Sequence, residues 1–379
     1  MTVCELNKCA GCMACLDICP KKCITIHDDL QFMNAEIDES QCINCGQCRR
    51  VCQRNHPAEL REPIAWYQGW AGKRVRCGSS SGGFSSAIEK AFISSGGVVA
   101  SCKLIDGEFK FALVRTIDGL KGFAGSKYVK SNPAGIYKAV REELQNGTKV
   151  LFLGLPCQVS SMKNFIGEKL GENLYTIDLI CHGTPSIKIL RMALKEYGVE
   201  LEACKEVLFR HNDRFEVEAD MKRIVPSRVS DFYTEAFMKG IDYTENCYSC
   251  HYAQGNRVSD LTLGDSWGSE IHEEEHDGIS LALVQTAKGQ ELLDMAGVTL
   301  KPVDLEKAKI PNTQLRHPTT LKPEHDVFFM EIMKGHSFKR AVLRCYPKWG
   351  LKQEVKLKLI KMHLLSDRGG VQAIRNSSN

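Results

Sequence analysis

Cysteine is the residue type whose spacing in this sequence could do the most specific chemistry. Ten of the 18 cysteines lie before residue 53, and eight of them form two runs of the pattern C-x2-C-x2-C-x3-C. In such a run the first three thiolates bind three corners of one [4Fe–4S] cube, while the fourth serves the opposite cube. We therefore expect two [4Fe–4S] clusters, one held by Cys9, Cys12, Cys15 and Cys52 and the other by Cys42, Cys45, Cys48 and Cys19.

Zinc is the alternative ligand of paired C-x2-C units, because four thiolates also make a tetrahedral zinc site. A zinc site needs only two such pairs, whereas eight positions here match two complete runs, which favours the clusters. Gln53 stands where the first run has Pro20, a small departure from the pattern. Cys4 and Cys23 lie outside both runs, and we interpret them as small buried hydrophobic residues.

The start of the chain argues against a disulfide scaffold. Exported proteins begin with a basic segment followed by an apolar run, and residues 1–19 contain neither. No apolar stretch reaches the roughly 18 residues that a membrane span requires. We therefore expect a cytoplasmic protein whose thiols bind metal. A net charge of +4 over 379 residues is too small to indicate nucleic-acid binding.

The sequence after the cysteine runs predicts an α/β fold. A polar linker at 53–63 precedes alternating strand and helix patterns, and the order strand, helix, strand, helix over 149–197 favours parallel strands with a right-handed crossover. No G-x-G-x-x-G follows a strand, so the mixed α/β domain is not expected to be of the Rossmann type. Strands are expected at 98–102, 109–115, 149–153, 174–180, 206–210, 261–264 and 281–285, with helices at 83–95, 159–165 and 187–197.

Four segments follow from these patterns: a ferredoxin-like module at 1–58, two parts of the α/β domain at 64–150 and 151–330, and a basic helical tail at 331–379. Residues 334–368 contain ten Lys or Arg against one Glu and one Asp. Such a tail is either a solvated helical segment that packs back on the domain or a docking surface for an acidic electron carrier or anionic substrate.

The loop Gly78–Gly83 (GSSSGG) leads directly into the expected helix at 83–95. Backbone N–H groups and hydroxyls at the start of a helix form a natural phosphate-binding site. The alternative is that the loop is only a turn.

Five segments carry a resemblance to a known family. They are SSSGGFSSAIEKAFISSGGVV, GSKYVKSNPAGIYKAVREEL, GLPCQVSSMKNFIG, IDLICHGTPS and CYSCHYAQGNRVSDLTLGDSWG. In this order they resemble the coenzyme F-420 hydrogenase/dehydrogenase beta-subunit family, including its 7-hydroxymethyl chlorophyll a reductase branch. The resemblance covers residues 1 to about 290.

The resemblance implies an FAD enzyme without a Rossmann fold, in which iron–sulfur clusters exchange electrons with the flavin. It places the flavin beside a serine-glycine segment and a second block at 125–128. The implied cofactor-binding residues are Ser79, Ser80, Ser81, Gly82, Gly83, Ser126, Lys127 and Tyr128.

Four further cysteines could form a third iron–sulfur centre. Cys157 and Cys181 each follow an expected parallel strand, so both belong to the edge where such sheets bind ligands, and Cys247 and Cys250 form a chelating pair. The alternatives are core packing for the first two and a small zinc or redox pair for the others. His182 is a candidate proton donor because imidazole titrates near neutrality, or else a capping histidine.

These observations predict a flavin-dependent iron–sulfur oxidoreductase. Electrons from a low-potential carrier, such as a ferredoxin or a reduced deazaflavin or flavin, would cross the clusters singly and collect on FAD to reduce a small organic substrate. The alternatives are a non-catalytic electron-input beta subunit of a larger hydrogenase or dehydrogenase complex, and a purely structural metal-binding protein. A homo-oligomer is compatible with the sequence.

Overall fold

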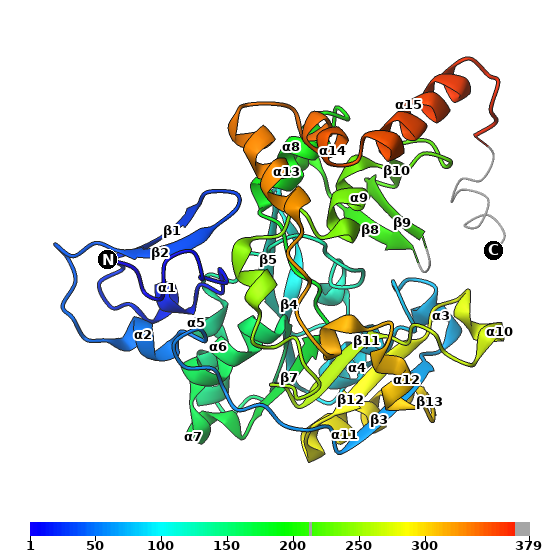
Figure 1. Ribbon diagram of the computed structural model, residues 1–379. Helices are drawn as coiled ribbons and strands as arrows, with labels where there is room; N and C mark the ends of the chain where they lie inside the picture. Colours follow the sequence, from blue (N-terminus) through cyan, green and yellow to red (C-terminus); the bar gives the residue numbers. More distant parts are fainter. Residues whose placement is uncertain (212–213, 368–379) are drawn as a thin grey trace.

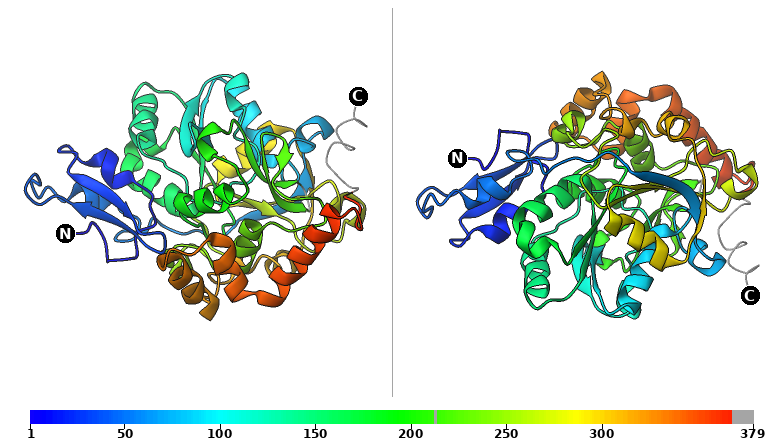
Figure 2. Two further views of the ribbon diagram at one scale, coloured as in Figure 1. Left: turned by 90° about the horizontal axis from the view of Figure 1, so that it is seen from above. Right: turned by 90° about the horizontal axis from the view of Figure 1, so that it is seen from below.

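The computed structural model describes residues 1–211 and 214–367. The N-terminal part forms a small domain that lies to one side of the body, blue in Figure 1 and seen from above and below in Figure 2. Its elements are α1 (Ala14–Ile18), β1 (Ile24–Asp28), β2 (Met33–Ile37) and α2 (Gln47–Val51). β1 and β2 pair as an antiparallel hairpin between the two cysteine runs.

The two cysteine loops share one backbone conformation. Gly11 and Asn44 occupy the same place between the first two cysteines of each run, with φ values of 67° and 53°. Met13 and Gly46 follow the second cysteine and are left-handed as well, with φ values of 59° and 70°. α1 and α2 begin directly after these residues. The duplicated sequence motif is therefore a duplicated structure.

An eight-stranded mixed sheet forms the centre of the body. Its strands, in order across the sheet, are β13 (Thr299–Lys301), β3 (Ala65–Trp70), β12 (Ser280–Val284), β11 (Leu261–Asp265), β7 (Leu174–Leu179), β6 (Val150–Gly154), β4 (Val98–Ile105) and β5 (Glu108–Val114). The central strands β11, β7, β6 and β4 run parallel, and the outer strands pair antiparallel with their neighbours. The parallel pair expected at 149–153 and 174–180 is confirmed by β6 and β7.

Helices cover both faces of the sheet. The helices are α4 (Phe84–Ser94) and α11 (Ala287–Ala296) on one face, and α5 (Ile136–Gln145) and α6 (Pro156–Ile166) on the other. Side chains of a strand alternate between faces, so Leu151 of β6 packs with α4 while its neighbour Phe152 packs with α5 and α6. The N-terminal domain joins the second face, because Ala14 and Val51 belong to the same buried cluster as Met162 of α6.

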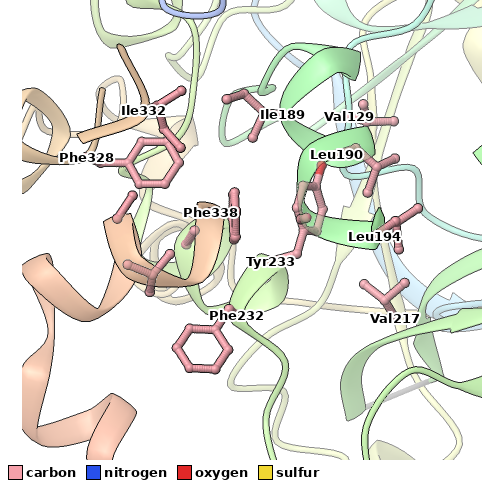
Figure 3. Close-up of a cluster of buried hydrophobic side chains, with 14 of the residues drawn as sticks. Val129, Ile189, Leu190, Leu194, Val217, Phe232, Tyr233, Phe328, Ile332 and Phe338 are labelled. Atoms are coloured by element: carbon pink, nitrogen blue, oxygen red, sulfur yellow. The ribbon is translucent and has the colours of Figure 1, made fainter. Parts of the chain in front are cut away.

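A second core lies above the sheet in the view of Figure 1. Three antiparallel strands, β8 (Val207–His211), β9 (Arg214–Ala219) and β10 (Lys222–Arg223), pack there with α8 (Ile187–Lys195), α9 (Phe232–Lys239), α13 (Pro323–Met333) and α14 (Phe338–Cys345). Figure 3 shows Leu190, Tyr233 and Phe338 converging from three of these helices. The strand expected at 206–210 is present as β8, in this separate sheet.

The basic segment begins inside this second core. Phe338, Ala341 and Val342 of α14 are fully buried, whereas in α15 (Pro347–Lys361) only Gly350 and Gln353 are buried. Residues 368–379 of the expected tail lie outside the described residues. Over the described residues, no helix combines the length and apolar character needed to cross a membrane. The remaining helical segments are α3 (Lys73–Arg76), α7 (Glu168–Gly171), α10 (His272–Glu275), α12 (Leu305–Lys309) and short 3-10 turns at Asp118–Leu120, Leu201–Ala203, Glu245–Ser249 and Thr313–Leu315.

Candidate functional site

The first group of ferredoxin cysteines draws on both runs. Burial raises the pKa of the Cys12 thiol to about 12, and the nearby thiols of Cys52 and Cys9 contribute to this rise. The pKa of Cys15 is raised by burial and then by the thiols of Cys12, Cys9 and Cys52. The structure thus brings Cys9, Cys12, Cys15 and Cys52 together, the crosswise set that the spacing predicts.

The second group lies nearer the surface. Cys19, Cys42, Cys45 and Cys48 line one small cavity of about 20 Å³. Cys45 is exposed, and Cys42 and Cys48 are half-buried. The two groups are neighbours, because the charge of Cys48 is one of the influences on the pKa of the Cys15 thiol.

Cys4 and Cys23 are buried, as expected, and each contacts a predicted ligand. The Cys23 sulfur lies 3.5 Å from the Cys19 sulfur. The Cys4 thiol donates to Cys52, and this hydrogen bond lowers the pKa of Cys52 to about 6. Their spacing in the sequence carries no signal of these contacts.

Four cysteines from three segments of the chain line a second cavity of about 240 Å³, which we call the cysteine cavity. Cys157 stands in the first turn of α6, and Cys181 follows β7. Burial raises the pKa of Cys181 to about 12, with further contributions from Cys247 and Cys250. The pKa of Cys157 is raised by burial and then by Cys250. The two strand-end thiols and the chelating pair therefore converge on one region.

These thiol groups fit a multi-iron centre. Four thiolates on one zinc ion all lie about 2.3 Å from it, whereas in a cube each thiolate binds a different iron. In the described part of the chain, no three Cys, His, Asp or Glu side chains come close enough to share a single metal ion. The second ferredoxin group and the four later cysteines each line a cavity, as the ligands of a cubane cluster would.

Lys130 lies between the first ferredoxin group and the cysteine cavity. Its ammonium group donates to the carbonyl of Ala10 at 3.2 Å, and the side chain lines the cavity. The thiol of Cys12 is near enough to influence the pKa of Cys157. The three thiol groups therefore follow one another in space, from the exposed second group through the first to the cysteine cavity.

A third cavity, of about 210 Å³, lies on the other side of Leu155 and Gln158, which line both it and the cysteine cavity. We call it the serine cavity, because the loop before α4 and the first turn of α4 form part of its wall. It also meets the carboxyl ends of β6, β7 and β11, the edge where α/β sheets bind ligands. Of the residues predicted to bind a cofactor, Ser79, Ser80, Ser81, Gly83, Ser126 and Lys127 line it.

The serine hydroxyls of this loop are engaged with the protein itself. Ser79 donates to the carbonyl of Val75, Ser81 donates to that of Ile279, and Ser80 accepts from the backbone N–H of Ser126. The backbone N–H groups of the first turn of α4 are available to a ligand, because they have no partner within a helix. Ser85 and Ser86 of that turn line the cavity.

Gly82, Tyr128 and His182 do not line the serine cavity. A Cβ atom on Gly82 would lie 2.4 Å from the carbonyl oxygen of Gly69 and 2.5 Å from the backbone nitrogen of Ser280, so close packing on β3 and β12 explains this glycine. Tyr128 stacks on Phe237, with ring centroids 4.3 Å apart. His182 is an exposed residue on the lining of the cysteine cavity.

Two charged groups of the serine cavity had no signal in the sequence. Arg210 forms an ion pair with Asp265 at 2.7 Å and lies 4.8 Å from the centroids of the Phe215 and Trp267 rings. Glu89 follows Ile88 of the apolar stripe of α4, and the helical pattern predicts that its side chain faces solvent. In the structure this side chain is only 3% exposed.

Comparison with known proteins gives two matches along the chain. Residues 8–55 match the 4Fe-4S dicluster domain, and residues 147–306 match the family described as the C terminus of the coenzyme F420 hydrogenase/dehydrogenase beta subunit. Over residues 147–306 the chain is similar to these beta subunits. The resemblance drawn from the motifs is thereby confirmed. The chain combines a ferredoxin-type N-terminal domain with a mixed α/β body.

Two individual proteins share this similarity. The coenzyme F420-dependent sulfite reductase of Methanocaldococcus jannaschii is 22% identical over 321 residues, which are 78% of this chain and 48% of that protein. The chain thus spans about half the length of the curated relative it matches. A chain of the F420-reducing [NiFe] hydrogenase complex of Methanosarcina barkeri is 17% identical with a TM-score of 0.47, covering 68% of this chain and 90% of that chain.

Proposed function

We propose that the chain is an iron–sulfur flavoprotein oxidoreductase with three [4Fe–4S] clusters and FAD. The observation that carries this proposal is the line of three thiol groups that ends at the cysteine cavity, one wall away from the serine cavity. Clusters pass single electrons, whereas an organic substrate takes two. Leu155 and Gln158 form the wall between the two cavities, so a flavin held in the serine cavity would supply the two-electron chemistry next to the third thiol group.

The chain's own residues supply distinct parts of this arrangement. The eight ferredoxin cysteines would hold two clusters, and Cys157, Cys181, Cys247 and Cys250 the third. The first turn of α4 would bind the FAD pyrophosphate through its free N–H groups, because a helix N-terminus attracts anions. The hydroxyls of Ser79 to Ser81 would hold the loop rather than the phosphates.

The exposed second group is the natural place for electrons to enter or leave. Cys45 is exposed there, so a one-electron carrier could approach closely. A two-electron reactant would instead meet the flavin. We propose that a low-potential carrier reduces the clusters and that FAD then reduces a small organic substrate.

A second candidate is the role of an electron-input subunit that receives electrons from a reduced deazaflavin. It rests on the names of the two similar proteins, both of which refer to F420. In that case a two-electron donor would reduce the flavin and the clusters would lead electrons outward to a partner. Turnover of an organic acceptor by the purified chain alone would favour the first candidate, and obligate co-purification with a partner the second.

Anaerobic purification followed by iron, sulfide and flavin analysis tests the cofactor set. Three cubane clusters require about twelve irons and twelve acid-labile sulfides per chain, with one FAD. About eight irons would remove the third cluster from the proposal. Zinc in place of iron, or protein without any flavin, would overturn it.

A further inference from the structure

Glu89 is a buried acid that has no partner within the described residues, where its carboxyl group makes no hydrogen bond and no ion pair. It lies on α4, is 3% exposed and lines the serine cavity. A buried carboxyl group without a partner costs several kcal/mol if it is charged. Such a group therefore either stays neutral or finds its partner in whatever fills the cavity.

The charged groups around Glu89 are engaged elsewhere. Lys127, from the loop opposite, directs its ammonium group to the carbonyls of Phe123, Ala124 and Gly125. Across the cavity, Arg210 is already paired with Asp265. Cys102 of β4 also faces the cavity and is neutral at ordinary pH, because burial raises its pKa to about 11.

Burial keeps Glu89 protonated near neutrality. It raises the pKa of the carboxyl group to about 8, against the opposing charges of Lys127 and of Lys90 on the exposed side of α4. A carboxylic acid at this pKa can release a proton at physiological pH and take it back.

We propose that Glu89 donates the proton that accompanies two-electron reduction of the cofactor in the serine cavity, and accepts it again on oxidation. This inference rests on the proposed function, because it needs a flavin in that cavity. Two clusters each lose one electron, Glu89 changes from the acid to the carboxylate, and the flavin gains two electrons and one proton. The clusters carry no protons, so this balance needs a proton source within the cavity, and solvent then reprotonates Glu89.

The test uses the full chain with its clusters and flavin. Glu89→Gln keeps the shape and hydrogen-bonding capacity of the side chain but has no proton to release, and Glu142→Gln makes the same change on an exposed residue of α5. Rapid-mixing reduction with dithionite gives the rate of flavin bleaching as a function of pH. In the wild-type chain the rate should fall about tenfold per pH unit above about pH 8, because the acid form disappears. Glu89→Gln should be slower by about 10² to 10⁴-fold, with no such pH dependence, while Glu142→Gln behaves as wild type.

Infrared difference spectroscopy gives a readout that does not depend on turnover. Reduction of the wild-type chain should remove or shift the infrared band of a protonated carboxyl group, either lastingly or transiently. This change should be absent from the spectrum of Glu89→Gln. A flavin-loaded Glu89→Gln with the wild-type rate and pH profile would overturn the proposal. If that variant loses flavin, the wild-type spectrum decides, and absence of any carboxyl change overturns it. A wild-type chain without flavin would instead refute the proposed function itself.

Discussion

The hydroxyl of Ser161 donates a hydrogen bond to the sulfur of Cys12, with 3.0 Å between the two atoms. Ser161 belongs to α6 of the body, whereas Cys12 belongs to the first cysteine run. The same cysteine is held from a second side, because the hydroxyl of Tyr137 donates to its carbonyl at 2.6 Å. The body of the protein therefore reaches into the environment of one ferredoxin centre, and hydrogen bonds to cluster sulfurs are among the factors that set a reduction potential.

Replacing Ser161 with alanine should lower the midpoint potential of the cluster that Cys12 is proposed to hold. In the wild-type chain this hydrogen bond stabilises the reduced, more negative cluster by about 1 kcal/mol relative to the oxidised one. Its loss should therefore lower the potential by about 40 mV for one electron. An EPR-monitored redox titration of the full chain measures this shift. Ser160→Ala is the matched control, because the hydroxyl of Ser160 accepts from the N–H of Ala58 rather than contacting Cys12. Equal potentials in the wild-type and Ser161→Ala chains would contradict the prediction.

Asp17 should stabilise the contact between the N-terminal domain and the body. Its carboxylate accepts from the backbone N–H groups of Gly135 and Tyr137, at 2.8 and 3.1 Å, at the start of α5. Asp17 therefore acts as an N-terminal cap of α5, although it belongs to the N-terminal domain and not to the body. Asp17→Ala should therefore lower the free energy of unfolding by about 1 kcal/mol. Asp17→Asn retains one acceptor oxygen and should lose less; equal thermal midpoints for all three chains would rule the cap out.

Glu89 should make the stability of the chain depend on pH. The pKa of this carboxyl group is about 8 in the folded chain and 4.5 ordinarily. Between these values the folded state binds more protons than the unfolded state, so stability falls as pH rises through the window. The loss should be on the order of a few kcal/mol. Glu89→Gln removes this contribution. In anaerobic melting experiments, the stability of the variant relative to wild type should therefore increase from about pH 5 to about pH 8. A difference in stability that does not change with pH would contradict the prediction.

The sequence predicts the thiol groups better than it predicts the serine cavity. Cysteine spacing is a local property, and the alternation of strand and helix places Cys157 and Cys181 at one sheet edge. The spacing also identifies Cys247 and Cys250 as a chelating pair, although only the fold brings that pair to the same cavity. The cavity wall depends instead on long-range packing. Glu89 points inward only because α4 meets the loop of Lys127 on the flank of its apolar stripe, and a single helical pattern cannot contain that information.

Gly82 illustrates the same limit. The serine-glycine motif predicts a phosphate-binding loop, whereas the structure explains this glycine by contact with β3 and β12. A glycine is required at position 82 because of contacts with Gly69 and with Ser280, and Ser280 lies almost 200 residues further along the chain.

Gly82→Ala should therefore destabilise the fold. The new methyl group would lie 2.4 Å from the Gly69 oxygen and 2.5 Å from the Ser280 nitrogen, and both are backbone atoms that cannot rotate away. We expect a loss of about 1–3 kcal/mol or more, as for other overpacked positions. Gly78→Ala, where the closest atom is the Val75 oxygen at 3.8 Å, is the control and should melt as wild type. Loss of flavin from Gly82→Ala without any loss of stability would instead indicate a direct ligand contact.

The double change Cys247→Ser with Cys250→Ser tests the proposed third cluster most directly. Serine is a poor thiolate substitute, so the cysteine cavity would retain only Cys157 and Cys181, too few to hold a cube. Iron should fall from about twelve to about eight per chain, with the EPR signals of the two ferredoxin clusters unchanged. Reduction of the flavin through the clusters should slow, because the centre between Cys12 and the serine cavity is gone. The control is Cys77→Ser, which replaces an exposed cysteine far from the thiol groups in sequence and should keep all twelve irons. An unchanged iron count in the double variant would end the case for a third cluster, and Cys247 and Cys250 would then be thiols without a metal.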